Sequence, residues 1–529
     1  MAITFVVGLV ITAMMIREFG MIRFGMFIGI VSLTDLTVYS VLSALSRSMI
    51  RDFSTARVRG DDARLRQMFS CGVAISLTLF AVIALSGIPV QALGARFLTF
   101  GPEFEHDLRA CIMATCALAG LYVAVTPWQA LIVSAKKIPQ LNFFQLLQRV
   151  FDLVAIGVVV VVGPAEGFVA FVWLRATLRA CSLLLMAWYA RTTTPSARVD
   201  LRSVNRKTVA EMFRTGGWAM GIPVSQLAFY ELDQLLLNLF VGPIYNSIYG
   251  VSNQIRGYAR MAGASIIQGT DALASDLQER GRLESVRNVL DASIRFPLVI
   301  TGCGAILLGI FAEPAISVWL YDSIAAGASD SGMTPEELIR LAAMFAAVML
   351  IGTVIAEPHY TAAGVLYGMG HLKRYSPVLI VSAIAKVTLG VLVLSQGFDP
   401  ISVIVVTVAL QFLVYGLYFP WLIADITDRT MWQMLTTVYA RPVLSLLIFA
   451  GIVFGVRSLV EIRSFPVLAV VLAGTGSLYI PLGYYIALRP QERQRIVGII
   501  SGRLRLRRAA KVDQSLPVSE DPLVEGTEI

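Results

Sequence analysis

Charged side chains occur inside stretches of this sequence that are apolar enough to cross a membrane. Six of them fall well within such stretches, namely Asp35, Glu231, Asp233, Arg256, Arg260 and Lys386. A charge near the middle of a bilayer costs roughly 2.5–3.5 kcal/mol even on the lenient insertion scale, so it usually faces a helix-bundle interior or a water-filled cavity. The sequence therefore predicts a polar pathway or pocket within the membrane.

The three basic residues of this set suit the binding of an anion. Arg256 and Arg260 are four residues apart and so share one face of a helix. Guanidinium groups match the geometry of phosphate oxygens, so Arg256, Arg260 and Lys386 together would hold a phosphate or pyrophosphate group. The alternative is that these cations only neutralise the three carboxylates across helix interfaces.

Other charged residues extend this hypothesis. Arg175 and Arg179 form a second pair four residues apart, which either continues the basic lining or snorkels along its helix. Asp152 is expected near the end of its span, where a role at the helix end is an equal alternative. Buried carboxylates titrate when they are desolvated, so Asp233 and Glu231 are candidates to carry a coupling proton or sodium ion, or to pack against an arginine.

Two prolines inside predicted spans are candidate hinges. Pro127 falls within the fourth span and Pro358 within the tenth. Proline kinks a helix because it has no amide hydrogen to donate to the preceding turn. Pro358 lies in the sequence Glu357-Pro358-His359, for which proton handling is the alternative role.

Composition restricts the class of protein. The chain has 529 residues, of which 57% are hydrophobic and only 15% charged, whereas a soluble domain carries about 25% charged residues. Five cysteines and three histidines show no metal-ligand spacing, and the net charge of +8 comes mainly from short loops rather than from a surface for nucleic acid. These properties predict an all-α polytopic membrane protein without a metal or a nucleic-acid partner.

The sequence also lacks the signs of an enzyme. It contains no P-loop, no paired nucleophile and base, and no sizeable soluble region. We therefore expect neither catalysis nor a cofactor, and any energy for transport would come from an ion gradient (H⁺ or Na⁺) or from consumption of the product.

Fourteen spans follow from hydropathy. Residues 1–16 are apolar but lack a basic start and a cleavage site, so they predict a short first span rather than a signal peptide. The others are expected at 24–45, 70–90, 110–134, 146–162, 168–190, 215–240, 244–270, 297–320, 338–364, 376–396, 400–424, 442–460 and 465–488. One set of alternate loops and the tail hold 31 Lys and Arg residues against 6 in the opposite loops. Both termini are therefore expected in the cytoplasm.

The order of features partly repeats along the chain. This predicts an N-terminal six-helix lobe (1–190), a cytoplasmic loop (191–214), a second six-helix lobe (215–424), two added spans (425–488), and a basic and then disordered tail (489–529). Repeated lobes around a site near the membrane midplane are a common transporter plan, with alternating access by rocking. Aligning Gly25 with Gly250 places Asp35 opposite Arg260, and aligning Gly163 with Gly397 places Asp152 opposite Lys386.

Several motifs resemble those of polysaccharide-exporting flippases. They are REFGMIRFGMFIGIVSL, SALSRSMIRDFSTARVRGDDARLRQ, LDQLLLNLFVGPIYNSIYGVSNQI and PHYTAAGVLYGMGHLKRYSPVLIVSAIAKVTLG. The third is the most specific, since the family has an acidic residue and a glycine turn at this place in its seventh span. Together they resemble the O-antigen (Wzx-type) flippase branch of the multidrug/oligosaccharidyl-lipid/polysaccharide (MOP) exporter superfamily.

The resemblance implies a function in the cytoplasmic (inner) membrane. It implies that an undecaprenyl-pyrophosphate-linked oligosaccharide is moved from the inner to the outer leaflet for surface polysaccharide synthesis. The expected partners are membrane lipids and a polysaccharide polymerase with its chain-length machinery. The family's cationic lumen would map onto Arg256, Arg260 and Lys386, with Arg175 and Arg179 as further members. Its acidic positions would map onto Asp35 and Asp233.

Three alternatives remain at this stage. Fourteen spans are shared with lipid II flippases of the same superfamily, although the arginine-rich pattern of that branch is absent from the first two spans. A drug/cation antiporter of the same fold would favour acidic cavity residues over basic ones. A membrane-embedded glycan polymerase or ligase would be expected to carry a large outward loop, whereas the longest here are about 91–107 and 321–337.

Overall fold

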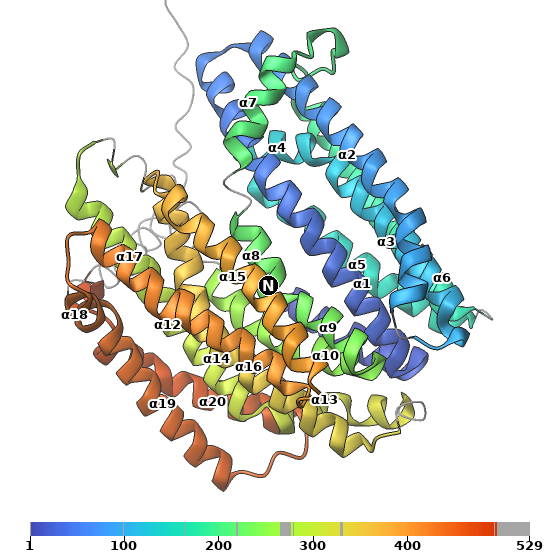
Figure 1. Cartoon of the computed structure of the whole chain (residues 1–529), viewed down its shortest axis with the longest axis vertical. Coiled ribbons are helices and arrows are strands. Elements are labelled where there is room, and N and C mark those ends of the chain that lie inside the picture. The colour runs from blue at the N-terminus through green and yellow to red at the C-terminus, as the bar shows by residue number, and fades with distance from the viewer. Residues whose placement is uncertain are drawn as a thin grey trace, which may run out of the picture.

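All regular secondary structure in the described part of the chain is helical, as the sequence predicts (Figure 1). The computed structural model describes residues 2–494 apart from 99, 164–165, 218–220, 265–273, 275–276, 279, 328–331 and 491. The helices of the first part of the chain are α1 (Ala2–Arg59), α2 (Asp62–Phe97), α3 (Glu105–Ala124), α4 (Thr126–Ser134), α5 (Ile138–Val162), α6 (Gly167–Thr193) and α7 (Arg206–Gly217).

The remaining helices begin with two short ones in series. They are α8 (Gly221–Tyr230), α9 (Leu232–Phe240), α10 (Pro243–Ala264), α12 (Leu283–Ile310), α13 (Ala312–Gly327), α14 (Pro335–Gly368), α15 (Leu372–Ser395), α16 (Ile401–Gln411), α17 (Phe419–Ile426), α18 (Met431–Met434), α19 (Ala440–Leu459) and α20 (Phe465–Leu482). Three π-helical segments, η5 (Phe412–Tyr418), η6 (Leu435–Tyr439) and η7 (Gly483–Ala487), join or extend the last of these.

Eleven helical segments of the described residues are long and apolar enough to cross a membrane. The second half of α1, the α8–α9 pair and α10 correspond to the other three predicted spans, so the structure agrees with about fourteen membrane helices. Two boundaries differ from expectation. The span predicted at 297–320 is divided, since α12 ends at Ile310 and α13 follows as a separate helix. The span predicted at 215–240 is interrupted at Glu231, which lies between α8 and α9.

Helix α1 is two antiparallel arms joined at a glycine. Gly20 has φ +82° and ψ 168°, a backbone conformation outside the helical region. Both arms pack on α10: Thr12 donates to Gln254 at 2.8 Å, and the Ser247 hydroxyl donates to the carbonyl of Met21. Because a side chain strains this conformation, a glycine suits the turn that reverses the chain.

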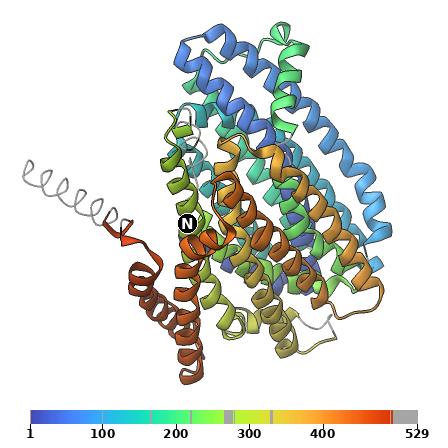
Figure 2. The same cartoon turned by 60° about the vertical axis from the view of Figure 1, so that its left-hand side comes forward.

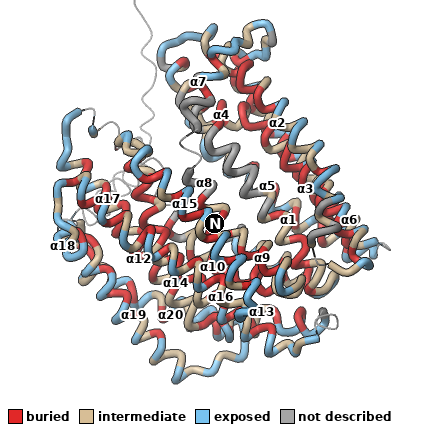
Figure 3. The backbone as a smooth tube through the Cα atoms, viewed as in Figure 1, coloured by how far each residue is buried: buried red, intermediate tan, exposed pale blue. Residues whose placement is uncertain are grey.

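The two arms and α10 lie between two groups of helices (Figure 1). Helices α2 to α6 contact one another on one side, while α12, α14, α15, α16 and α19 pack on the other. Turning the molecule shows α19 and α20 at the edge of the second group (Figure 2). Exposed positions lie along the outer helices of both groups (Figure 3). Apolar side chains such as Val161, Leu459 and Val470 are among the exposed residues, as expected for surfaces that face lipid. The lobe boundaries proposed from the repeat stay a prediction.

Glycines allow the second arm of α1 to approach α10 closely. A Cβ added to Gly25 would lie 2.8 Å from the backbone nitrogen of Ser247, and one added to Gly250 would lie 2.6 Å from the side chain of Ile28. Small residues at helix crossings are the usual means of close packing in membranes. The two glycines that the repeat aligns thus meet at one helix crossing.

Replacing Gly25 with Ala should destabilise the protein, because the added methyl group pushes α1 away from α10. Overpacking of this kind costs about 1–3 kcal/mol. We expect Gly25→Ala to lower the unfolding temperature of the purified protein in detergent. Gly455→Ala on α19 is the matched control, since a Cβ there meets nothing within 4 Å. An unfolding temperature for Gly25→Ala equal to that of the control would contradict this account of the crossing.

Candidate functional site

A break in the seventh span frees a backbone acceptor in the membrane interior. Glu231 separates α8 from α9, and the amide of Gln234 bonds to the Glu231 carbonyl at 3.2 Å. The carbonyl of Tyr230 instead accepts from the Tyr249 hydroxyl at 2.7 Å and from Nη2 of Arg256 at 3.1 Å. Burial demands that a freed carbonyl finds a donor, so the break and Arg256 belong to one arrangement.

Arg256 is enclosed by this arrangement. Its guanidinium lies 4.4 Å from the centre of the Tyr230 ring and also donates to the side chain of Asn253. Asn253 in turn donates to Glu231 at 3.5 Å. Arg256 is buried, so in this conformation it supports the bend of the chain at Glu231.

Arg260, one turn further along α10, is much more accessible. It forms an ion pair with Glu357 of α14. Its guanidinium also lies 4.3 Å from the centre of the Tyr230 ring, which Arg256 contacts as well. Its side chain is 32% exposed, whereas that of Glu357 is 5% exposed. Part of the Arg260 side chain is therefore accessible while its guanidinium is paired with Glu357.

Lys386 and Asp233 form the most deeply buried pair. The Lys386 ammonium on α15 makes an ion pair with Asp233 on α9, and the two side chains are 0% and 2% exposed. The second Asp233 oxygen accepts from the Thr407 hydroxyl of α16 at 2.8 Å. Here the structure shows the pairing that the sequence left as the alternative to anion binding.

A separate cluster joins α5 to α6. Asp152 accepts from Nε and Nη2 of Arg179 at 2.7 and 2.5 Å, and lies 3.1 Å from Nε of Arg175. Arg175 also lies 4.9 Å from the centre of the Phe27 ring of α1. The alternative of a helix-end role for Asp152 is wrong, because α5 begins at Ile138 rather than near residue 146 and places Asp152 well inside.

The two clusters differ in charge. The cluster around α10 brings together three cations and three carboxylates, which are Arg256, Arg260, Lys386, Glu231, Asp233 and Glu357. The cluster of α5 and α6 has two guanidiniums for the single carboxylate of Asp152. The interior of the described chain is therefore nearly neutral around α10 and positive around α6.

Arg149 is a candidate residue that the sequence analysis did not single out, because it was counted among the 31 basic residues of the loops and tail. It lies eleven residues into α5, roughly 16 Å along the helix at 1.5 Å per residue. It is exposed, and it interacts electrostatically with Asp152 on its own helix and with Tyr258 on α10. Its spacing of three residues from Asp152 was the signal available in the sequence.

Other predicted site residues are placed as follows. The side chain of Asp35 lies outside the described residues, so its pairing in the repeat stays a prediction. Pro127 follows the break between α3 and α4 at Val125, whereas α14 continues as one helix through Pro358. Their hinge roles stay predictions.

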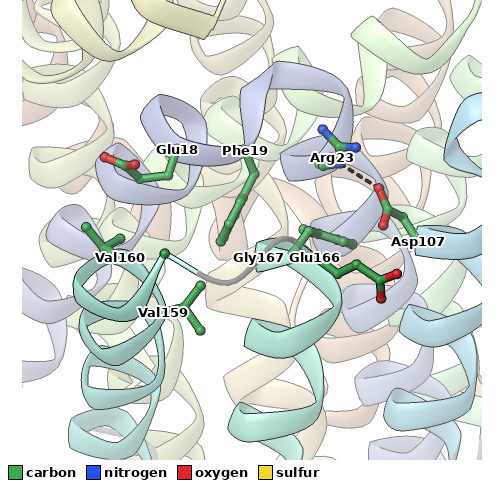
Figure 4. A pocket seen from close by; sticks show the side chains of 10 residues that line it. Glu18, Phe19, Arg23, Asp107, Val159, Val160, Glu166 and Gly167 are labelled. Atoms are coloured by element: carbon green, nitrogen blue, oxygen red, sulfur yellow. Dashed lines mark hydrogen bonds and ion pairs between the residues drawn. The ribbon is translucent and has the colours of Figure 1, made fainter.

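Two cavities adjoin these elements. One of about 40 Å³ is lined by Glu231, Gln234, Asn238 and Asn246 and by the second arm of α1. The other, of about 380 Å³, lies between the turn of α1 and the adjoining ends of α5 and α6, with the Arg23–Asp107 ion pair (2.5 Å) on one side and Glu18 on the other (Figure 4). The larger cavity does not include the candidate cations of α6, α10 or α15.

Breaking the Lys386–Asp233 pair from one side should destabilise the protein strongly. Removing one partner of a buried ion pair costs about 3–5 kcal/mol, while replacing both with apolar residues is often neutral. We expect Asp233→Leu to unfold at a markedly lower temperature in detergent and Asp233→Leu with Lys386→Met to recover most of the loss. The Thr407 hydroxyl keeps its bond to the Val403 carbonyl in both variants. A double variant no more stable than the single one would show that the pair is not the source of the effect.

Comparisons with known proteins bear on this arrangement. No protein-family model matches the sequence. The chain is 22% identical over 306 residues to the uncharacterized membrane protein EpsK of Bacillus subtilis (strain 168), a match that covers 56% of this chain and 59% of EpsK. The match thus spans about three fifths of the length of that relative.

Solved structures give wider coverage. The lipid II flippase MurJ in an inward closed conformation superposes with a TM-score of 0.66 at 12% identity, over 92% of this chain and 98% of MurJ. An inward-facing MATE family multidrug resistance transporter of the MOP superfamily gives a TM-score of 0.62 at 12% identity, over 80% of this chain and 96% of the transporter. The chain is therefore a multi-pass integral membrane protein with the fold that MurJ and the MATE transporters of the MOP superfamily have.

Proposed function

We propose that this protein is a flippase that moves a polyprenyl-pyrophosphate-linked oligosaccharide from the inner to the outer leaflet of the cytoplasmic membrane. The undecaprenyl carrier and a role in O-antigen or another surface polysaccharide come from the sequence resemblance. A polysaccharide polymerase and its chain-length machinery are the proposed partners. The distribution of basic loops supports cytoplasmic termini.

The observation that carries this proposal is the partly exposed side chain of Arg260, whose guanidinium is paired with Glu357. Of the five cations that sequence analysis singled out, only Arg260 has a side chain that is about one third exposed, at 32%. Lys386, Arg256, Arg175 and Arg179 are all buried. Arg149 of α5 is exposed, and it interacts electrostatically with Tyr258 of α10, the helix that carries Arg260. Two such groups on different helices suit the two phosphates of a pyrophosphate.

The pairing of Glu357 with Arg260 provides a way to release the bound pyrophosphate. Glu357 already occupies Arg260, so an incoming pyrophosphate exchanges with a carboxylate instead of meeting a bare charge. When the helix groups rock, the return of Glu357 to Arg260 displaces the cargo. Rocking of this kind around a midplane site is how repeated-lobe transporters alternate access. Pro127 and Pro358 are the proposed hinges.

Glu231 is the proposed coupling group, either for a proton or for sodium. Asp233 is held by Lys386 and Thr407, so it has no free oxygen for a transported ion. Glu231 has a longer contact, 3.5 Å to Asn253, and borders the small cavity beside Gln234, Asn238 and Asn246. A carboxylate next to a polar cavity can exchange its ion without breaking a strong pair.

Lipid II is the second candidate cargo. MurJ is described as a lipid II flippase and superposes on 92% of this chain, whereas the MATE transporter covers 80%. A drug/cation antiporter is the less favoured candidate, because the exposed charge nearest the cluster, that of Arg149, is a cation.

Removing Arg260 together with its partner should slow flipping without exposing a lone buried charge. We expect Arg260→Gln with Glu357→Gln, reconstituted in proteoliposomes, to flip a fluorescent polyprenyl-pyrophosphate glycan at least about tenfold more slowly, since a charge-assisted hydrogen bond contributes about 1.5–3 kcal/mol. Arg149→Gln should slow flipping by a similar factor. Assays with an O-antigen-type glycan and with lipid II would separate the two cargoes.

The matched control is Arg340→Gln, which removes an exposed guanidinium from α14 near the opposite end of that helix from Glu357. It should flip at the wild-type rate. Wild-type flipping by the Arg260/Glu357 variant at normal expression would mean that the cluster is structural and that the proposed function has lost its main support.

A further inference from the structure

Five arginines from four separate segments lie near one another in the second group of helices. Arg287 and Arg295 lie on α12, Arg429 precedes α18, Arg441 is the second residue of α19 and Arg489 follows η7. All five belong to the 31 Lys and Arg residues of the loops and tail from which the orientation in the membrane was inferred. Three of them, Arg429, Arg441 and Arg489, line one recess of about 810 Å³, and Arg287 and Arg295 form ion pairs with Asp428 and Glu492.

The carboxylate of Asp291 contacts two arginines of this cluster. It accepts from Arg429 at 2.8 and 3.1 Å and lies 3.4 Å from Arg489. Arg295, 1% exposed, forms an ion pair with Glu492. Buried carboxylates thus fix the guanidiniums of the floor, and a rigid basic floor is what a bound anion requires.

The π-helical segment η6 contributes a backbone acceptor to the same floor. The Thr437 carbonyl accepts from Arg295 at 3.1 Å and from Arg489 at 2.8 Å. π-helical turns are rare and occur frequently at functional sites. The segment therefore ties α12 to the residue that follows η7 at the base of the recess.

Positive charge exceeds negative charge here. Within the part of the chain that the structure describes, Asp291, Asp428 and Glu492 face the five arginines. Arg441 is exposed and forms no ion pair with any described residue. The recess therefore presents one unneutralised guanidinium, beside the hydroxyl of Thr436 and the amide of Gln433.

The elements that form the recess also carry exposed apolar side chains. Trp432 and Tyr485 are 73% and 66% exposed, and Val443, Leu444 and Leu447 continue an exposed apolar strip along α19. Exposed Trp and Tyr are typical of the membrane–water interface. A molecule with an anionic group and an apolar chain could thus place the anionic group beside the arginines and the apolar chain along α19.

We propose that this recess binds the phosphate headgroup of an anionic phospholipid, with the acyl chains along α19. Basic pockets between membrane helices on the cytoplasmic side are known to take such headgroups. The site is separate from Arg260 and Arg149, so it concerns lipid bound to the second helix group rather than the cargo.

The test measures phosphatidylglycerol binding to the purified full-length chain. We expect phosphatidylglycerol, but not phosphatidylcholine, to raise its unfolding temperature in detergent, since a ligand that binds only the folded state stabilises it. Arg441→Gln should weaken phosphatidylglycerol binding about tenfold, the loss of one charge-assisted contact. It should fold normally because Arg441 holds no ion pair among the described residues, and Arg441→Lys should retain part of the affinity.

Arg457→Gln is the matched control, an arginine at the other end of α19, and it should bind like the wild type. Equal stabilisation by the two phospholipids, or unchanged binding by Arg441→Gln, would overturn the proposal. Stabilisation by free inorganic pyrophosphate equal to that by phosphatidylglycerol would show a soluble anion site and would overturn the lipid assignment. None of these results depends on flipping activity.

Discussion

The desolvation of charge within a membrane is the constraint on which this structure depends. A guanidinium or carboxylate that leaves water needs a partner, and each of the three central pairs recruits its partner from a different helix. Lys386 joins α15 to α9, Arg260 joins α10 to α14, and Asp152 joins the two arginines of α6 to α5. These ion pairs thus link the helices that surround α10 to one another.

Such pairs contribute little net stability, because desolvation offsets much of their attraction. Under the proposed function their value lies elsewhere, since a paired charge can be exchanged for a cargo charge at small net change in free energy. How far a pair is buried distinguishes a structural pair from one that can exchange its partner for a cargo charge. Lys386 and Asp233 are closed off and hold helices together, whereas Arg260 is held by Glu357 and still reaches outside.

Hydropathy was sufficient to predict the helices, the turn before Pro243 and the interior position of the charges, because these depend on local sequence. The partners of the charges were not predictable. Lys386 was aligned with Asp152 in the repeat, yet it pairs with Asp233, 153 positions earlier in the chain, and the choice depends on how α9 meets α15. The break at Glu231 was also missed, since it is stabilised by Arg256 and Tyr249 acting on a freed carbonyl. Arg149 was misplaced because α5 begins eight residues before the expected start of its span.

The central claim is that a pyrophosphate contacts guanidiniums of α5 and α10. The most direct measurement is photo-crosslinking in native membranes with a polyprenyl-pyrophosphate glycan that carries a photoreactive group beside the pyrophosphate. This account predicts labelling of peptides around Arg149 and Arg260, reduced by an excess of unlabelled cargo. Labelling confined to the cavity beside Arg23 and Asp107, or to the recess beside Arg441, would contradict it.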